Sequence, residues 1–215
     1  MQGQQRSGEA YTHVFWIGGS PCAGKTSIAD ALAARYQGMA YHFDRMEMNH
    51  IARSNEATNP HLMAFLAMDM AQRWLTRSPG AMARNAIASW QARFSLVLED
   101  VRALPAHAPI FAEGPGLFPE CVAPLLLHPR QAVWLVSTAP FCMAVRTQRG
   151  GSTLETSNPT LALRNIVRRD LRMARYVKRQ AAARQLICYA VDGSRSLAQM
   201  TALVEQQFAP YLPAR

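Results

Sequence analysis

The sequence predicts a three-layer α/β/α fold built on a five-stranded parallel sheet. Five short apolar runs are candidate strands, and they lie at residues 13–18, 40–44, 109–113, 132–138 and 186–192. These runs are almost continuously hydrophobic, as strands buried on both faces of a parallel sheet are. Helical segments separate them, and strands that alternate with helices are typical of parallel α/β sheets. The 215 residues suit a single domain, which we expect to span residues 1–215.

The helical segments are predicted at residues 24–36, 60–75, 81–104, 119–127, 140–148, 159–184 and 197–208. The longest insertion, residues 45–108, lies between the second and third strands. Because ligands of parallel α/β folds bind beyond the carboxyl ends of the strands, we expect this insertion to cap a ligand site. Residues 1–10 are polar and are predicted to form a flexible tail.

The composition is that of an ordinary globular protein, with 49% apolar and 17% charged residues. The N-terminal residues contain no apolar signal segment, and no apolar run approaches the length of a bilayer span. The four cysteines form no CxxC pair, so neither a zinc site nor a disulfide framework is indicated. We therefore expect a cytoplasmic protein with reduced thiols and without a membrane partner.

The net charge of +9 is unevenly distributed. Ten of the 23 basic residues lie within residues 146–184. Of all 23, only Lys25 and Lys178 are lysines, and the others are arginines. Such a segment fits a nucleic-acid surface, and it also fits a lid that closes over a phosphate compound. The lid is favoured because of the motif that begins at Gly19, and the arginine bias also fits a GC-rich genome.

Residues 19–26 match the phosphate-loop pattern GxxxxGK[ST] at every fixed position, after an apolar strand and before a helix. The loop glycines let the backbone approach phosphates, and the helix N-terminus favours an anion. Lys25 is expected to reach the β- and γ-phosphates, and Thr26 to bind Mg²⁺. We predict ATP and Mg²⁺ as cofactors, with nucleotide contacts from Gly19, Ser20, Cys22, Ala23, Gly24, Lys25, Thr26 and Ser27. For Cys22, a small residue that fits the loop is favoured over a reactive thiol.

Two carboxylates follow predicted strands at the same sheet edge as the loop. Asp44 lies nineteen residues after Lys25 and is a candidate general base or Mg²⁺ ligand; the alternative is a helix N-cap. Glu113 is a candidate base or a residue that binds Mg²⁺ through water; the alternative is a charged strand end that faces solvent.

The chain lacks the NKxD motif of GTPases and the Asp-Glu strand end of AAA ATPases. With its phosphate loop and Asp44, it resembles the small P-loop kinases of the nucleoside, nucleotide and shikimate kinase superfamily. It is also similar to chloramphenicol phosphotransferases in its GGS and AGK segments. The segments at residues 18–25, 111–119 and 165–170 resemble those of bacterial kinases with a GGSPCAGK loop.

The resemblance implies the strand order 2-3-1-4-5 and a lid, with its following helix, at residues 141–184. Arg149 and Arg169 are implied as contacts of the transferring phosphoryl group, followed by Arg146 and Arg168. An exposed surface role is open for each of these arginines. The loop at Gly193 is implied to lie near the adenine, or else to be a plain turn.

The resemblance implies transfer of the γ-phosphoryl group of ATP to a hydroxyl of a small molecule, either a metabolite or an antibiotic-like natural product. Residues 45–108 would then bind the acceptor, with Arg45, Arg53, Trp74 and Arg77 as candidate contacts. The alternatives are a nucleoside or nucleotide kinase, and a nucleotide-switch protein that binds nucleic acid. A monomer and a homodimer are both compatible with the sequence.

Overall fold

The computed structural model describes residues 11–150 and 155–213. Its five strands form one parallel sheet in the order β2-β3-β1-β4-β5, which confirms the predicted α/β fold and strand order. Each strand lies within two residues of its predicted position. The strands are β1 (Val14–Gly19), β2 (Met39–His42), β3 (Ile110–Glu113), β4 (Ala132–Ser137) and β5 (Cys188–Val191).

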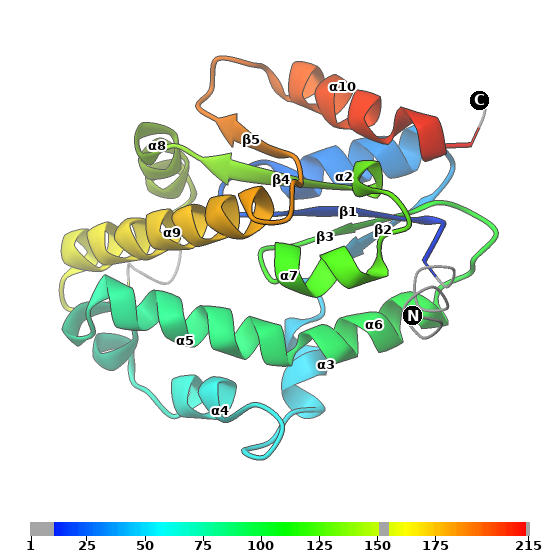
Figure 1. Cartoon of the computed structure of the whole chain (residues 1–215). Coiled ribbons are helices and arrows are strands. Elements are labelled where there is room, and N and C mark those ends of the chain that lie inside the picture. The colour runs from blue at the N-terminus through cyan, green and yellow to red at the C-terminus, as the bar shows by residue number, and fades with distance from the viewer. Residues whose placement is uncertain (1–10, 151–154, 214–215) are drawn as a thin grey trace.

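Alternating side chains of β1 separate two hydrophobic cores, as a pleated strand requires. Phe15 and Ile17 pack beneath α2 (Lys25–Arg35) and α10 (Leu197–Phe208). Val14 and Trp16 face the opposite core, which is covered by α6 (Phe94–Ala103), α7 (Pro119–Val122) and α9 (Pro159–Ala182). Figure 1 shows the resulting layers, with α2 and α10 on one side of the sheet and α7 and α9 on the other.

The predicted helix at residues 60–75 is two elements. The helix α4 (Pro60–Leu66) ends early, and a π-helical turn follows at Gln72–Thr76. Asp69 and Gln72 explain the break, because the backbone N–H of each donates to the side chain of the other, at 3.0 and 2.7 Å. This reciprocal capping starts a new helical turn.

The predicted helix at residues 81–104 is also divided, into α5 (Pro79–Ala92) and α6. Ser78 caps α5 and Pro79 occupies its first turn, so the helix begins two residues earlier than predicted. The division falls at Arg93, whose buried guanidinium donates to His50 and to the carbonyl of Phe43. These contacts tie the helix to the segment that includes α3 (Glu47–Ala52).

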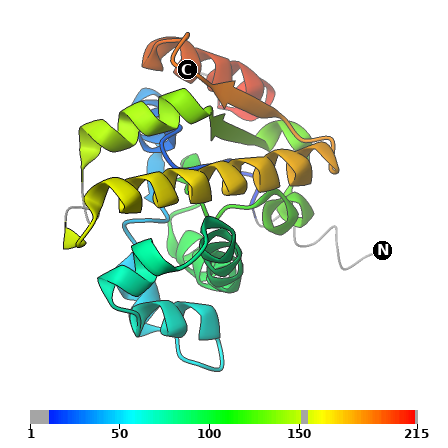
Figure 2. The ribbon, with the colours of Figure 1, turned by 90° about the vertical axis from the view of Figure 1, so that its left-hand side faces the viewer.

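The remaining helices frame the sheet edge where the strands end. In the view of Figure 2, α8 (Ala139–Arg149) and α9 lie side by side. The predicted lid at residues 141–184 therefore consists mainly of these two helices; its residues 151–154 lie outside the described part of the chain, as does the predicted tail at residues 1–10.

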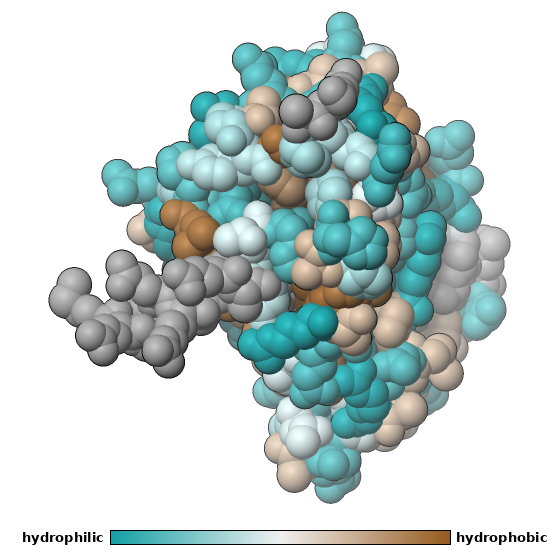
Figure 3. Space-filling model, turned by 90° about the vertical axis from the view of Figure 1, so that its right-hand side faces the viewer, coloured by the Kyte–Doolittle hydropathy of each residue, from teal (hydrophilic) through white to brown (hydrophobic). Residues whose placement is uncertain are grey.

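The outer surface is mixed in polarity. Figure 3 shows one face, on which hydrophilic residues predominate and apolar residues form small separate patches. Within the described ranges, every helix is too short or too polar to cross a lipid bilayer.

Candidate functional site

The loop between β1 and α2 is shaped for a phosphate group. Gly24 occupies the N-cap position of α2 in the left-handed conformation, with φ of 76°. The first turn of α2 has neither a capping side chain nor an acidic residue, so its N–H groups remain free to bind an anion. Gly19 has φ of 129°, and a Cβ there would lie 1.9 Å from the carbonyl oxygen of Leu135, so the loop start requires glycine.

Hydrogen bonds fix this loop to β4. The Ser20 hydroxyl lies 3.1 Å from that of Ser137 and accepts the backbone N–H of Ser137 at 2.9 Å. Ser20 is buried, and neither Gly19 nor Ser20 is among the residues that line the cavity above the loop.

A cavity of about 220 Å³, which we call the phosphate pocket, opens over the loop. Lys25 lines it and is 6% exposed, with its Nζ donating to the carbonyl of Ser20 at 2.8 Å. Burial lowers the pKa of Lys25, while Glu113 and Asp44 act in the opposite direction. The other lining residues are Pro21, Cys22, Ala23, Gly24, Thr26, Ser27, Asp44, Trp90, Glu113, Pro115, Arg146, Arg149 and Arg169.

Glu113 is buried at the end of β3, which excludes the interpretation as a solvent-facing strand end. Its Oε1 accepts hydrogen bonds from Thr26 Oγ1 at 3.1 Å and from His42 Nδ1 at 2.9 Å. The other ring nitrogen of His42 lies 3.0 Å from Asp30 Oδ1. A buried carboxylate next to a hydroxyl provides oxygen ligands of the kind that Mg²⁺ prefers, so Thr26 and Glu113 fit this ion.

Asp44 is exposed and lines the phosphate pocket. The helix α3 has Met46 at its N-cap position and no capping side chain, so Asp44 does not cap it. The Asp44 carboxylate therefore lies at the pocket without a capping role.

Three arginines line the phosphate pocket, and a buried carboxylate holds two of them. Arg146 from α8 donates to Asp170 Oδ2 at 2.7 and 3.0 Å. Arg169 donates to Asp170 Oδ1 at 2.7 and 2.9 Å. Arg149 is exposed, and no ion pair of it is found within the described residues. Asp170 thus fixes one arginine from each helix at the pocket, while Arg149 stays free to move.

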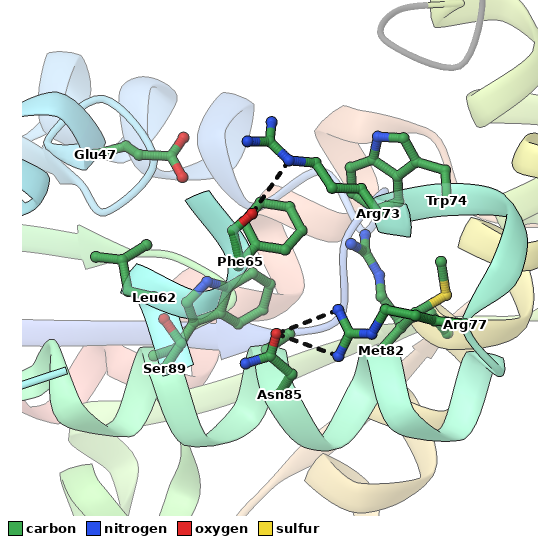
Figure 4. Close-up of a pocket in the computed structure, with 12 residues that line it drawn as sticks. Glu47, Leu62, Phe65, Arg73, Trp74, Arg77, Met82, Asn85 and Ser89 are labelled. Carbon is green, nitrogen blue, oxygen red and sulfur yellow. Dashed lines mark hydrogen bonds between the residues drawn. The ribbon is translucent and has the colours of Figure 1, made fainter. Parts of the chain in front are cut away.

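A second cavity of about 280 Å³, which we call the side cavity, lies between α4, the π-helical turn and α5 (Figure 4). Trp74 and Arg77, two of the predicted acceptor contacts, both line this cavity. Its wall is completed by Glu47, Leu62, Phe65, Arg73, Met82, Asn85, Ala86, Ser89, Trp90 and Arg169.

The two cavities adjoin. Trp90 and Arg169 line both of them, so a molecule in the side cavity would lie next to one in the phosphate pocket. The π-helical turn is anchored at this junction, because Asn165 of α9 donates to the carbonyl of Trp74 at 3.0 Å. Arg169 also lies 5.4 Å from the ring centre of Trp74.

Two other predicted ligand contacts line neither cavity. Arg45 is exposed and lies 3.7 Å from Asp30. Arg53 pairs with Glu99 and with Asp100, at 2.7 Å from the latter. The physical reason is that carboxylates nearby in the fold, which spacing along the chain does not reveal, draw both guanidinium groups away.

The end of β5 borders a third hollow, beside the phosphate loop. Phe141, Val145, Val191 and Leu197 contribute apolar wall, and Cys22 and Arg149 are shared with the phosphate pocket. Gly193 is not part of this wall; its Cα is close to Phe141, where a Cβ would lie 3.1 Å from the ring. An adenine ring beside the loop would therefore meet Phe141 and Val191 more directly than Gly193.

The residue pattern predicted no role for Asp170 or Arg73, and it placed Trp90 among the aromatic residues of the insertion that could line a ligand pocket. An acidic residue within an arginine-rich helix was the available signal for Asp170, since a buried carboxylate needs cationic partners. For Arg73 no such signal exists, because the π-helical turn that directs it into the side cavity is not visible in the helical periodicity.

No protein-family model matches the chain, and no curated protein matches it. Among solved structures, it is similar to a protein of Eubacterium ventriosum described as uncharacterized, with 13% identity, a TM-score of 0.47, and coverage of 92% of this chain and 98% of the other. It is also similar to shikimate kinase of Aquifex aeolicus, with 9% identity, a TM-score of 0.38, and coverage of 92% and 96%. Likenesses this distant do not indicate what the chain acts on.

Proposed function

We propose that the protein is an ATP- and Mg²⁺-dependent kinase that transfers the γ-phosphoryl group to a hydroxyl of a small molecule. The observation that carries this proposal is the adjacency of two cavities, one built by the phosphate loop and one by the insertion, which share Trp90 and Arg169. Two substrates can meet only at such a junction, because phosphoryl transfer needs donor and acceptor in line.

The residues of the phosphate pocket have separate roles in this proposal. Lys25 and the first N–H groups of α2 hold the phosphates, and Thr26 with Glu113 holds Mg²⁺. Bound Mg²⁺ supplies charge neutralisation at the phosphate oxygens. Arg146, Arg149 and Arg169 stabilise the charge on the transferring group.

Asp44 is the general base in this proposal. It is exposed at the pocket and its side chain does not cap α3, whereas the carboxylate of Glu113 accepts hydrogen bonds from Thr26 and His42. A base must reach the acceptor hydroxyl, and the free carboxylate is better suited than the buried one.

The test is phosphorylation of a pool of hydroxyl-bearing metabolites, nucleosides and natural products with ATP and Mg²⁺, read by mass spectrometry. We expect one product with an added phosphoryl group, and its loss in Lys25→Ala. Lys178→Ala is a matched control, because Lys178 is exposed and is the only other lysine. A product that persists in Lys25→Ala would refute the assignment of the phosphate loop.

A second candidate, a nucleotide switch that binds nucleic acid, is favoured by one observation. Several arginines of α9 are exposed at helical spacing, and we find no carboxylate pair for them within the described residues: Arg164, Arg168, Arg172, Arg175 and Arg179. Such a basic stripe binds phosphate backbones with strong salt dependence. Tight binding of a single-stranded oligonucleotide at physiological salt, without phosphorylation of any pooled compound, would support this candidate.

A further inference from the structure

The side cavity has a chemical character that bears on the acceptor itself. Its wall is largely apolar and aromatic, with Phe65 and Trp74 in edge contact at 5.7 Å between ring centres and Trp90 at the junction. Such walls suit a flat or ring-shaped apolar body. A flexible, strongly hydrated polyol would gain little binding free energy from contact with these apolar surfaces.

Two cations face this cavity without a carboxylate partner among the described residues. Arg73 donates to the carbonyls of Phe65 and Leu66, at 3.2 and 2.8 Å. Arg77 makes long contacts with neutral acceptors: Met68 Sδ at 3.3 Å, and Asn85 Oδ1 and the carbonyl of Ala81 at 3.4 Å. Figure 4 shows both guanidinium groups extending into the cavity region, toward Phe65 and Asn85.

The charged residues in the wall of the side cavity favour an anionic ligand. Asp170 is shared by Arg169 and Arg146, so it offsets only part of their charge, and Glu47 is the only acidic residue in the cavity wall. Arg73 and Arg77 therefore leave the wall with an excess of positive charge. Half-buried guanidinium groups with unused donors bind an oxyanion by charge-assisted hydrogen bonds, which are stronger than their bonds to neutral oxygens.

We propose that the acceptor is a ring-bearing hydroxy acid, held through its carboxylate or another oxyanion by Arg77 and Arg73. Its ring would lie against Phe65, Trp74 and Trp90, and its hydroxyl would point past Arg169 toward the phosphate pocket. This inference rests on the proposed kinase function, since it names the substrate class of the same site.

The test compares hydroxylated aromatic and alicyclic carboxylic acids with their primary amides and with the corresponding phosphate and sulfate esters. Binding to the full-length protein is measured by calorimetry without ATP, and phosphorylation is measured separately. We expect the acids to bind and the amides to bind about ten- to a hundred-fold more weakly, because each amide loses a charge-assisted bond. The affinities of the phosphate and sulfate esters, compared with those of the carboxylic acids, show which oxyanion the arginines prefer.

Arg77→Gln should weaken acid binding by a similar factor and leave the amides unaffected. Arg84→Gln is the matched control, since Arg84 is an exposed arginine of the adjoining helix α5 and lines neither cavity. Thermal unfolding of each variant shows whether it is folded, and Arg73→Gln provides a second variant. Equal binding of acids and amides would overturn the proposal. If acids bind through Arg77 but are never phosphorylated, the anion site stands and the kinase function fails.

A second inference comes from two thiols at the phosphate loop and does not depend on the acceptor. Cys22 lies in the loop with φ of 65°, and Cys142 lies in the first turn of α8. Their sulfur atoms and a carboxylate oxygen of Asp170 all lie within 4.8 Å of one another. Because Asp170 already binds two arginines, a metal ion would have to displace them, so the pair is better suited to redox chemistry.

Cys22 is only 7% exposed, but the part that is exposed faces two cavities. It lines both the phosphate pocket and the hollow beside β5. The Cys142 thiol, by hydrogen bonding, lowers the pKa of Cys22 below its ordinary value of 9.0; burial opposes this effect and Arg146 adds to it. Burial raises the pKa of Cys121 to about 12 and that of Cys188 to about 11, so these thiols stay protonated.

We infer that Cys22 and Cys142 form a reversible disulfide when the protein meets a hydroperoxide. The Cys22 thiolate attacks the peroxide, whose O–O bond breaks, giving a sulfenic acid and hydroxide. The Cys142 sulfur then displaces the sulfenic oxygen, which leaves as water with the thiol proton. The new S–S bond ties the phosphate loop to α8, the helix that carries Arg146 and Arg149.

Reduced protein treated with hydrogen peroxide should lose two hydrogens by intact-mass spectrometry and regain them with dithiothreitol. Peptide mapping should place the bond between Cys22 and Cys142. In Cys142→Ser, oxidation should stop at the sulfenic acid of Cys22, because the second thiol is missing. Cys22→Ser should not react with peroxide. Cys121→Ser is the control and should form the disulfide as the unaltered protein does. A non-hydrolysable ATP analogue should slow the reaction by covering the loop. Oxidation that is unchanged in Cys22→Ser, or a bond to Cys121 or Cys188, would overturn the inference.

Discussion

Asp44 and Glu113 show how two carboxylates at one sheet edge acquire different chemistry. Glu113 is 3% exposed and accepts two hydrogen bonds, while Asp44 is exposed at the phosphate pocket. The buried carboxylate of Glu113 is held in position by its two hydrogen bonds. The exposed carboxylate of Asp44 can move with a substrate. This difference in exposure follows from their positions along the chain. Asp44 lies after the end of β2 at His42, whereas Glu113 is the last residue of β3.

For Asp44→Asn, we expect turnover to fall by about 10²- to 10⁴-fold, which is the usual contribution of a general base. The amide cannot accept the hydroxyl proton, but the phosphate loop is unchanged, so ATP affinity should stay the same. Steady-state kinetics with calorimetric titration of ATP checks both quantities. Unchanged turnover would show that Asp44 is not the base.

Glu113→Gln should act on the metal instead. The amide keeps one oxygen for Thr26 but loses the negative charge, and changes of this kind cost roughly ten- to a hundred-fold in metal affinity. The Mg²⁺ concentration for half-maximal ATP turnover should rise accordingly. Glu56→Gln, at an exposed glutamate outside both cavities, is the control and should leave it unchanged.

At the scale of elements, a hydrogen-bonded contact joins the π-helical turn of the insertion to α9. Asn165 is buried on α9 and donates to the carbonyls of Trp74 and Leu75, at 3.0 and 3.4 Å. The π-helical turn that carries Arg73 and Trp74 has no buried residue of its own. Its position at the side cavity therefore depends on contacts with neighbouring elements, of which this hydrogen bond and the edge contact of Trp74 with Phe65 are two.

Asn165→Ala should loosen that turn while the sheet stays intact. We expect faster amide hydrogen exchange over residues 72–76 and a loss of roughly 1–3 kcal/mol in stability, the cost of leaving buried carbonyls without donors. Arg164→Ala, at the exposed neighbouring position, should change neither. Unchanged exchange at the turn would show that packing alone holds it.

Local signals predicted some elements well and others poorly. The strands were predictable because buried parallel strands are apolar along their whole length, and the phosphate loop because its residue types are fixed by its geometry. The break after α4 was not, since it depends on the reciprocal bonds of Asp69 and Gln72. Pairing of Arg146 with Asp170, and of Arg53 with Asp100, joins residues far apart in the chain, which spacing does not reveal.

At the scale of the whole molecule, one buried polar cluster links the insertion to β2. His50 is fully buried, lying 2.7 Å from Asp100 Oδ2 and accepting a hydrogen bond from Arg93 at 3.2 Å. Tyr41 donates to the same Asp100 oxygen at 2.9 Å. Burial lowers the pKa of His50, although the bond to Asp100 opposes this effect.

Stability should therefore fall as the pH drops below 6.5, the ordinary pKa of histidine. Below that value the unfolded chain binds a proton at His50 that the folded chain does not, so protonation favours unfolding. The pKa of Asp100 is also lowered, since bonds from Arg53, His50 and Tyr41 outweigh its burial, and this contribution is lost at still lower pH. Urea unfolding at a series of pH values measures the slope. His50→Gln should flatten it near pH 6.5, and an unchanged slope would contradict this role.

The shared carboxylate of Asp170 has a thermodynamic consequence. It ties Arg146, at the phosphate pocket, to Arg169, which borders both cavities. A ligand that repositions either guanidinium must therefore shift the other, so occupancy of one cavity alters the free energy of filling the second. By linkage the effect is mutual, and the two substrates should bind with synergy whose size is the same whichever of them enters first.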